Sequence, residues 1–325
     1  ADRMAAHVLE SGDIVFGRKG AVDRHLLVTP ECAQWMQGSD CIRLRLSGDV
    51  LIPRYVSYAM LEEPHKKWML AQCGNKATMA SLNHDVIKRI EIFVPPVPVQ
   101  REIVGVLTAY DDLIENNHRR IKLLEDAARL LYREWFVHLR FPGHEHVKVV
   151  DGVPEGWGRM ALGDVLTLQR GFDLPSGARV EGEIPIFAAT GVHGSHNKAM
   201  VSGPGVITGR SGSLGAVSYS PGDFWPLNTT LWIKEFKRVA PEFAYFLLSV
   251  LGLEQYNGGV AVPTLNRNDV HRIQVNLPSQ ALMDEFNEFA LLQFRQVATL
   301  TQQTEKLRQA RDLLLPRLMR GDLAV

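Results

Sequence analysis

Residues 81–96 read SLNHDVIKRIEIFVPP, and residues 264–279 read TLNRNDVHRIQVNLPS. The two stretches share Leu-Asn near the start, Arg-Ile in the middle and a proline near the end. A second pair precedes them in the same order, because LIPRYVSYAML at 51–61 resembles VAPEFAYFLLS at 239–249. One sequence pattern therefore occurs twice in this chain of 325 residues.

A glycine-rich stretch extends the pairing upstream, because GRSGSLG at 209–215 shares Gly-Arg-x-Gly with GRKGAV at 17–22. Three pairs in the same order predict a tandem duplication. Ala1 then aligns with His193, whereas the second copy opens near Val153, so we expect the first domain to be incomplete. A truncated gene, an excerpted sequence or a segment supplied by another subunit would each explain that difference.

Both copies predict the same order of secondary structure. Strands separated by Gly and Pro come first, followed by a short aromatic and aliphatic helix. A strand over RIEIFV (89–94) or RIQVNL (272–277) follows, and then a proline boundary and a long helix. The fold class is therefore mixed α/β, with a small sheet and helices in each copy and two long helices.

Apolar residues recur at steps of four and three along both long helices, which is the pattern of a coiled-coil seam. The seam positions are Ile103, Leu107, Tyr110, Ile114, Ile121, Leu124, Leu131, Trp135, Phe286, Val297, Leu300, Leu307 and Leu314. Seams of this length favour packing of the two helices on each other over packing of each helix on its own domain. Arg311 occupies a seam position, Pro316 predicts a kink or an end of the second helix, and Gly321 predicts its C-terminal stop.

Composition and charge exclude several classes of protein. The chain has 36 Lys and Arg against 36 Asp and Glu, so any binding of a polyanion must come from local clusters of charge. The three cysteines form no Cys-x-x-Cys pair, which favours a reducing cytosol over a disulfide framework or a zinc site. No apolar run approaches the roughly 20 residues of a membrane span, and the opening residues lack the features of a signal peptide. We therefore expect a cytoplasmic protein with no membrane partner.

The stretch GRSGSLG (209–215) has the composition of a phosphate-binding loop but lacks its Gly-Lys-[Ser/Thr] ending and a following helix pattern. Alternating residues on both sides predict a turn between two strands. Both copies place an arginine after the first glycine, Arg18 and Arg210, and the first copy adds Lys19. Such a turn suits contact with a DNA phosphate or a guanine edge. A turn alone and a turn that also binds DNA both remain open, because the glycines require only the turn.

Polar and aromatic loops in both copies resemble variable reading loops mounted on a fixed scaffold. The candidate DNA contacts are Arg18, Lys19, Asn75, Lys76, Arg170, His193, Asn197, Lys198, Arg210, Ser211 and Ser213. Solvated surface loops are the alternative for all of them. His193 and His196, in the stretch HGSH, are interpreted as surface polar residues, because no cysteine or acidic ligand lies beside them.

A nuclease is the main enzymatic alternative. Asp223, followed by Glu235 and Lys237, loosely resembles the Pro-Asp…[Asp/Glu]-x-Lys pattern of metal-dependent nucleases. Such sites need carboxylates that converge on Mg²⁺ and a lysine near the attacking water. The matching segment of the first copy, GSDCIRLRLSGDV (38–50), contains no Glu-x-Lys, which favours a strand end at the surface.

Several longer stretches resemble one known family. They are VPEGWGRMALGDVLTLQRGF (153–172), GRSGSLGAV (209–217), PTLNRNDVHRIQVNLP (263–278), LLYREWFVHLRFPGHE (130–145) and LRQARDLLLPRLMRGDL (307–323). Taken together, they resemble the specificity subunits of type I restriction-modification systems. The resemblance covers nearly the whole chain, and the order of the stretches is more specific than any one of them.

The resemblance implies a non-catalytic subunit that recognises DNA. Such subunits alternate target recognition domains with long helices that form an antiparallel coiled coil, and each domain reads one half of a bipartite target in double-stranded DNA. The helices act as a spacer and dock the methylation (M) subunits, and the complex recruits the restriction (R) subunits. This chain is then expected to bind no cofactor itself, while its partners use S-adenosylmethionine, ATP and Mg²⁺.

The expected domains follow from the repeat and the resemblance. They are an incomplete recognition domain at 1–98, a first spacer helix at 99–140, a connector at 141–152, a second recognition domain at 153–278, and a second spacer helix with the C-terminal tail at 279–325. A metal-dependent nuclease using Asp223, Glu235 and Lys237 remains the alternative function. A helix-mediated scaffold without a DNA role is a third interpretation.

Overall fold

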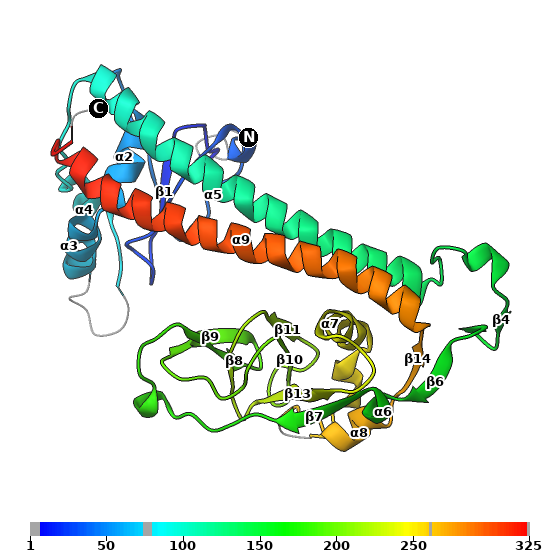
Figure 1. The fold of residues 1–325 in the computed structure, drawn as a ribbon. Helices are drawn as coiled ribbons and strands as arrows, with labels where there is room; N and C mark the ends of the chain where they lie inside the picture. The colour runs from blue at the N-terminus through cyan, green and yellow to red at the C-terminus, as the bar shows by residue number, and fades with distance from the viewer. Residues whose placement is uncertain (1–6, 74–79, 260–261, 324–325) are drawn as a thin grey trace. The chain divides into compact units, whose positions relative to one another are not determined.

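The computed structural model describes residues 7–73, 80–259 and 262–323. The chain divides into two compact units, the first made of residues 1–118 with 302–325 and the second of residues 119–301. Each unit contains small sheets and helices, and both long helices contribute to each unit (Figure 1). The mixed α/β class expected from the sequence is confirmed.

The first unit contains a three-stranded antiparallel sheet of order β2-β1-β3. Its strands are β1 (Ile14–Gly17), β2 (His25–Leu27) and β3 (Cys41–Leu44), and its short helices are α2 (Pro53–Met60), α3 (Glu63–Cys73) and α4 (His84–Lys88), with a 3-10 turn at Pro30–Cys32. Ile14 and Phe16 of β1 are fully buried, whereas Val15 between them is partly exposed. This alternation gives the sheet one buried face, which shares a core with Met60 of α2 and Met69 of α3.

The second unit is built on a four-stranded antiparallel sheet of order β11-β10-β13-β7. The strands are β7 (Leu166–Arg170), β10 (Gly205–Gly209), β11 (Val217–Ser220) and β13 (Thr230–Phe236). β10 is buried along its whole length, because it lies between two neighbours and under α7 (Pro241–Val250). Its turn to β11 therefore follows a buried strand that is paired on both sides.

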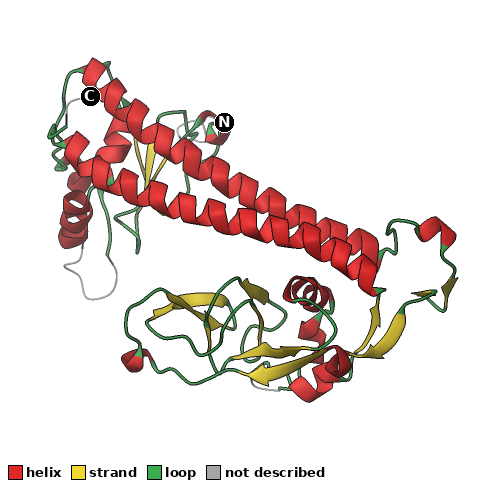
Figure 2. Ribbon diagram, in the orientation of Figure 1, coloured by secondary structure: helices red, strands yellow, loops and turns green. Residues whose placement is uncertain are grey.

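Smaller elements surround this sheet (Figure 2). A second sheet has the order β12-β8-β9, and two strand pairs, β14-β6 and β4-β5, complete the unit. Their bounds are β4 (Val149–Val150), β5 (Val153–Pro154), β6 (Gly158–Ala161), β8 (Ile184–Ala188), β9 (Gly191–His196), β12 (Trp225–Pro226) and β14 (Gln274–Leu277). The short helices are α6 (Leu162–Val165) and α8 (Arg267–His271), with 3-10 turns at His144–His146, Ser176–Ala178 and Leu253–Tyr256.

The two units share one topology at their centres. β1 pairs with β2 and β3, and β10 pairs with β11 and β13, always antiparallel. Each of these sheets is followed by a helix, α2 or α7, and later by a short helix after the shared Leu-Asn, α4 or α8, with the additional helix α3 in the first unit. The predicted tandem duplication is therefore confirmed in the order and pairing of the strands.

One predicted strand is wrong. RIQVNL contains β14, which pairs with β6, whereas RIEIFV at 89–94 forms no strand. A strand requires a neighbour that takes up its backbone N–H and C=O groups. In the second unit β6 is this neighbour, and no described strand pairs with residues 89–94.

The long helices are α5 (Val97–Tyr132), which continues into the π-helical Arg133–Val137, and α9 (Gln280–Met319). In the first unit, Leu107 of α5 shares a buried cluster with Leu318 of α9. In the second unit, the rings of Tyr132 and Phe286 meet edge to face with centroids 5.4 Å apart. The early part of each helix thus packs on the late part of the other, so the predicted antiparallel pairing is confirmed.

The predicted seam residues are buried to different degrees. Ile103, Leu107, Ile114, Phe286 and Leu300 are buried, and Tyr110, Ile121, Leu124, Leu131, Trp135, Val297, Leu307 and Leu314 are partly exposed. Arg311, a charge at a seam position, has a specific partner, because its Nη1 lies 2.7 Å from the Asp111 carboxylate of α5. The Tyr58 hydroxyl donates to the same carboxylate over 2.6 Å. This charge is therefore paired and hydrogen-bonded inside the helix interface.

Pro316 was expected to kink or end the second long helix, and the predicted end is wrong, because α9 continues through this residue to Met319. A proline removes one backbone hydrogen bond, and here the loss falls in the last turn of the helix. Leu315, Leu318 and Met319 are buried around it, and their burial offsets the missing bond. Gly321 ends the helix as predicted, with a φ of +74° and its N–H donating to the Leu318 carbonyl over 3.2 Å.

Candidate nucleic-acid interface

The stretch GRSGSLG forms the turn between β10 and β11, as predicted. Gly209 ends β10 at a place where a Cβ would collide with the Ser213 carbonyl oxygen. Gly212 and Gly215 have φ angles of +88° and +85°, which glycine adopts without steric cost. The backbone path therefore explains the glycines, whereas it does not require Arg210.

Backbone hydrogen bonds hold Arg210 from both sides. Its N–H donates to the Thr229 carbonyl over 2.8 Å, and its carbonyl accepts from the Leu265 N–H over 2.8 Å. The Gly212 N–H donates to the Pro263 carbonyl over 3.0 Å. These bonds tie the turn to the segment that leads into α8, so the Arg210 side chain starts from a fixed position.

The first unit repeats this arrangement. The Arg18 N–H donates to the Asp40 carbonyl over 2.8 Å, and the Arg18 carbonyl accepts from the Leu82 N–H over 2.9 Å. The Gly20 N–H donates to the Ala80 carbonyl over 3.1 Å. Each bond corresponds to one in the second unit, so the two copies present an arginine from the same backbone frame.

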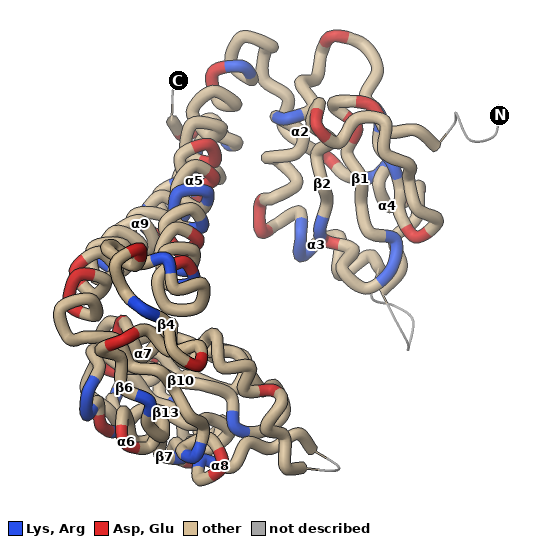
Figure 3. Tube along the Cα trace, turned by 90° about the vertical axis from the view of Figure 1, so that its right-hand side faces the viewer, with Lys and Arg blue, Asp and Glu red and all other residues tan. Residues whose placement is uncertain are grey.

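Arg210 shares a groove of about 470 Å³ with two other arginines. Arg170 comes from the end of β7 and Arg267 from the first turn of α8, and Thr264 and Asn266 line the same groove. The Asn266 side chain accepts the Asn268 N–H over 3.0 Å and so caps α8, which sets Arg267 at its first position. Figure 3 shows Lys and Arg along the trace beside β7 and α8.

The three guanidinium groups of this groove have no acidic partner among the residues that the structure describes. In the described ranges no ion pair involves Arg170, Arg210 or Arg267, and Arg210 makes a long contact of 3.5 Å with the Asn228 carbonyl. Like charges held together without a counter-ion attract an anion. The planar fork of arginine matches both a phosphate and the O6/N7 edge of guanine. The groove is therefore suited to a nucleic acid.

Other predicted contacts lie near the two turns. Ser211 bridges to Thr264 beside the arginine groove, and Ser213 is exposed further along the same turn. Lys19 is exposed and lies 3.3 Å from the exposed Asp40 carboxylate. An exposed pair of this kind contributes little to stability, so Lys19 can exchange Asp40 for a phosphate.

A second set of predicted contacts is separate from the groove. His193 lies on β9 of the β12-β8-β9 sheet, and Asn197 and Lys198 directly follow this strand; all three are exposed. Asn75 and Lys76 lie outside the described residues. The structure therefore brings together Arg170, Arg210 and Ser211 but not the whole predicted set.

Two residues differ from what the sequence suggested. Arg267 is absent from the predicted contacts, although it directly follows the Leu-Asn that both copies share. His196 is buried rather than at the surface, because its Nδ1 contacts the Val180 backbone at 3.1 Å and its ring meets Trp225 edge to face. The first lines the groove and was not found from the sequence pattern alone, and the second is a buried residue.

The three residues of the nuclease alternative have separate partners. The Asp223 carboxylate accepts the Gly203 N–H over 3.1 Å, and Glu235 accepts the Thr167 hydroxyl over 3.2 Å across β13 and β7. Lys237 donates to the Gly163 carbonyl over 2.6 Å. These contacts explain each residue as part of the local fold.

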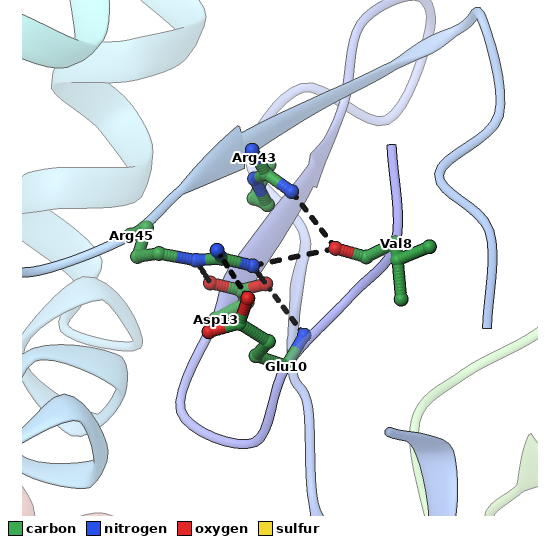
Figure 4. Close-up of polar contacts among 5 residues, drawn as sticks. All are labelled: Val8, Glu10, Asp13, Arg43 and Arg45. Atoms are coloured by element: carbon green, nitrogen blue, oxygen red, sulfur yellow. Dashed lines mark hydrogen bonds and ion pairs between the residues drawn. The ribbon is translucent and has the colours of Figure 1, made fainter. Parts of the chain in front are cut away.

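An ion pair between the buried Asp13 and the exposed Arg45 lies at the opposite end of β1 from Arg18 (Figure 4). The Asp13 carboxylate is 1% exposed and accepts two bonds of 2.7 Å from Arg45 and one of 2.8 Å from the Glu10 N–H. Burial alone would raise the pKa of Asp13, but these hydrogen bonds hold it below its usual range. Arg43 adds a bond of 3.0 Å to the Val8 carbonyl. The cluster fixes residues 8–13 on β3 and so positions β1.

The described parts of the chain contain neither a metal-ion cluster nor a membrane-spanning helix. No group of three His, Cys, Asp or Glu side chains there is placed to hold a metal ion. None of the helices in those parts has the length and apolar character needed to cross a membrane.

The repeat, the two Gly-Arg turns and the helix pair define a DNA specificity component. The chain belongs to the family described as the type I restriction modification DNA specificity domain, whose model matches residues 5–126 and 154–304. One matched range falls in each copy of the repeat. The chain is accordingly a specificity subunit of this class, a recognition component rather than a catalytic one, and the nuclease alternative is not supported.

Individual relatives agree with this assignment. The chain is 24% identical over 305 residues to the type I restriction enzyme MjaIX specificity subunit of Methanocaldococcus jannaschii, covering 85% of this chain and 70% of the relative. It is 20% identical to the HindI specificity subunit of Haemophilus influenzae, covering 98% and 88%. Its fold is similar to the crystal structure of the type I restriction-modification S subunit from M. genitalium, with a TM-score of 0.64 at 18% identity, covering 96% and 84%.

Proposed function

We propose that this subunit reads a bipartite target in double-stranded DNA, with one half read by each copy of the repeat. The observation that carries the proposal is the duplicated backbone frame, in which three equivalent hydrogen bonds hold Arg18 in one unit and Arg210 in the other. A repeated turn needs its glycines for the fold alone, but it does not need the repeated arginine. We therefore assign Arg18 and Arg210 to contacts with the DNA.

Within the second unit, the arginines of the groove make two different kinds of contact with the DNA. Arg170 and Arg267 are exposed and suit phosphate contacts, which position the protein on the duplex. Arg210 is partly buried and held by its backbone, which suits the more exacting geometry of a guanine edge. His193, Asn197 and Lys198 lie on another sheet and form a second group of contacts in this proposal.

The domain division belongs to the same proposal. Residues 1–98 and 153–278 act as the recognition domains, and residues 99–140 and 279–325 act as spacer helices on either side of the connector at 141–152. Both long helices carry exposed leucines, which support the docking of methylation subunits on them: Leu113, Leu123 and Leu130 of α5 and Leu292 and Leu313 of α9. In the assembled complex, S-adenosylmethionine belongs to the methylation subunits, and ATP and Mg²⁺ to the restriction subunits.

The direct test is DNA affinity of the complex assembled with methylation subunits. Arg210→Ala should weaken binding to a duplex selected by the unmodified complex by about tenfold or more, because one phosphate or guanine contact contributes about 1–3 kcal/mol. Arg159→Ala is the matched control, since Arg159 is an exposed arginine on β6 of the same unit and does not line the groove. Fluorescence anisotropy at physiological salt measures both.

Equal affinities for Arg210→Ala and Arg159→Ala would reduce the Gly-Arg turn to a structural feature. The salt dependence separates the two kinds of contact. Loss of a phosphate contact lowers the slope of log affinity against log salt by about 1, whereas loss of a guanine contact relaxes the choice of base.

A further inference from the structure

His271, the last residue of α8, forms a hydrogen bond to the edge of the central sheet of the second unit. Among the described strands, β7 lies at this edge and pairs with β13. Leu168, which is buried in β7, donates its N–H to His271 Nε2 over 2.9 Å. A backbone amide can only donate, so Nε2 must be the unprotonated nitrogen of a neutral ring.

A close approach of α6 holds His271 in this place. A Cβ on Gly163 would lie 3.1 Å from the His271 Cβ and 3.3 Å from the His271 carbonyl oxygen. Lys237 Nζ donates to the Gly163 carbonyl over 2.6 Å, so the position of Gly163 is fixed in turn. The glycine therefore permits close packing of α6 on α8, which keeps the His271 backbone in one position.

The bond joins the two elements that carry exposed arginines of the groove. Arg170 lies two residues after Leu168 on β7, and Arg267 lies four residues before His271 on α8. Residues four apart lie on the same face of a helix, so the face of α8 that carries Arg267 is also the face that meets β7. Both arginines line the groove of about 470 Å³.

Arg170 and Arg267 do not hold α8 and β7 together themselves. Both are cations without an acidic partner among the described residues, so they repel each other. Val270 of α8 and Leu168 of β7 share a buried core, but apolar contact is not directional. Among the described residues, the bond from Leu168 to His271 is the one side-chain hydrogen bond between α8 and β7. It therefore fixes the orientation of α8 on the strand.

We propose that His271 is a positioning residue of the arginine groove: its ring nitrogen holds α8 against β7 and thereby sets the spacing between Arg267 and Arg170 for the phosphates of the DNA. Arginines that are held in place before the DNA arrives bind it more tightly, because less conformational freedom is lost on binding. This inference rests on the proposed DNA contact of the groove, and it adds a residue that acts without touching the DNA.

The surroundings of the ring favour its neutral form. Burial lowers the pKa of His271 below its usual value, and the positive charges of Lys237 and Arg267 lower it further. The ring is therefore neutral at about pH 7, as its role as an acceptor requires.

The carboxylates on the elements around the ring do not compensate for these cations. Asp269 of α8 pairs with Arg272 over 3.5 Å, and Glu235 of β13 accepts a hydroxyl of β7 over 3.2 Å. Asp164 of α6 is exposed. As the pH falls below about 6.5, towards the lower pKa of the folded chain, Nε2 takes up a proton and the acceptor for the Leu168 N–H is lost. The contribution of the bond is therefore complete at neutral pH and is lost in acid.

Two substitutions of His271 test the acceptor in the complex assembled with methylation subunits. His271→Gln places an amide oxygen near the position of Nε2 and should keep the affinity for the selected duplex within about twofold at neutral pH. His271→Leu fills a similar space without an acceptor and should weaken binding about fivefold or more, because the buried Leu168 N–H is left unpaired. His146→Leu is the matched control, since His146 is an exposed histidine of the same unit that does not line the groove.

The pH profile separates positioning from a general effect on folding. The quantity measured is the ratio of the affinities for the selected duplex and for an unrelated duplex of equal length. A non-specific complex depends on net charge rather than on a fixed register, so the ratio removes the general attraction that an added proton brings. The ratio should fall in the unmodified complex between about pH 7.5 and pH 5.5, and it should fall less in the His271→Gln complex, whose acceptor does not titrate.

Three outcomes would overturn the role of His271. One is an unchanged affinity of the His271→Leu complex while Arg210→Ala weakens binding, which would leave the proposed function standing. Another is an equal loss of affinity in His271→Gln and His271→Leu, because the acceptor would then not be what matters. The third is an equal fall of the ratio with pH in the unmodified and His271→Gln complexes. If neither Arg210→Ala nor His271→Leu changes the affinity, the proposed function fails together with this inference.

Discussion

Arg18 and Arg210 lie in equivalent turns, and their repetition in the sequence was enough to single them out. Arg267 could not be found in this way, because its groove is assembled from the end of β7, the turn after β10 and the start of α8. His196 was misplaced for a similar reason, since the stretch HGSH does not reveal the Trp225 ring that covers it. At this scale the sequence predicts which side chain a turn carries but not which side chains meet.

The Asp13–Arg45 pair is expected to make the first unit sensitive to acid. The pKa of Asp13 is lower in the folded chain than in the unfolded chain, so its contribution to stability is complete above the ordinary pKa of an aspartate. The contribution is lost as the pH falls below about 4, through the folded pKa. Arg45→Met leaves a buried carboxylate with a missing partner and should lower the free energy of unfolding at neutral pH by about 1–3 kcal/mol.

Urea unfolding at neutral and acidic pH measures this effect. Arg43→Met is the control, because Arg43 contacts the Val8 carbonyl and leaves the bonds between Arg45 and Asp13 intact. The loss of stability in acid should be smaller for Arg45→Met than for Arg43→Met or the unmodified chain. The same acid sensitivity in all three would mean that other groups govern it.

At the scale of elements, local patterns predicted helices well and one strand badly. Both long helices have the seam periodicity, and both were found. RIEIFV and RIQVNL have similar strand propensity, yet RIQVNL contains β14 and RIEIFV forms no strand. A strand also needs a neighbouring strand to pair with, and its own sequence does not show whether one is present. Pro316 does not end α9, because the tertiary contacts of Leu315 and Leu318 hold the last turn of the helix.

An exposed glycine inside α5 gives a test at this scale. Gly105 is exposed, and a Cβ there would meet nothing within 4 Å. Gly105→Ala should therefore raise the free energy of unfolding by about 0.5–1 kcal/mol, since glycine is that much less favourable than alanine inside a helix. Ala109→Gly, one turn later on the same exposed side, should lower it by a similar amount. A change of the same sign for both variants in thermal unfolding would show that α5 is not a helix at these positions in solution.

For the whole molecule, the duplication was the most informative feature of the sequence. It predicted two similar sheets and two long helices, and the order of the shared stretches pointed to the family that the comparisons confirm. The sequence did not predict that three backbone bonds at each Gly-Arg turn would be equivalent, because their partners Asp40 and Thr229 share no pattern. These bonds are the basis of the claim that both copies read DNA in the same way.

That claim is tested most directly by hydroxyl-radical footprinting of the assembled complex on its own target duplex. Complexes carrying the unmodified chain, Arg18→Ala and Arg210→Ala are compared at DNA concentrations where the unmodified complex is saturated. The unmodified complex should protect two separate blocks of DNA backbone, Arg18→Ala should weaken protection of one block, and Arg210→Ala should weaken protection of the other. Weakening of the same block by both variants, or of neither block, would contradict the account.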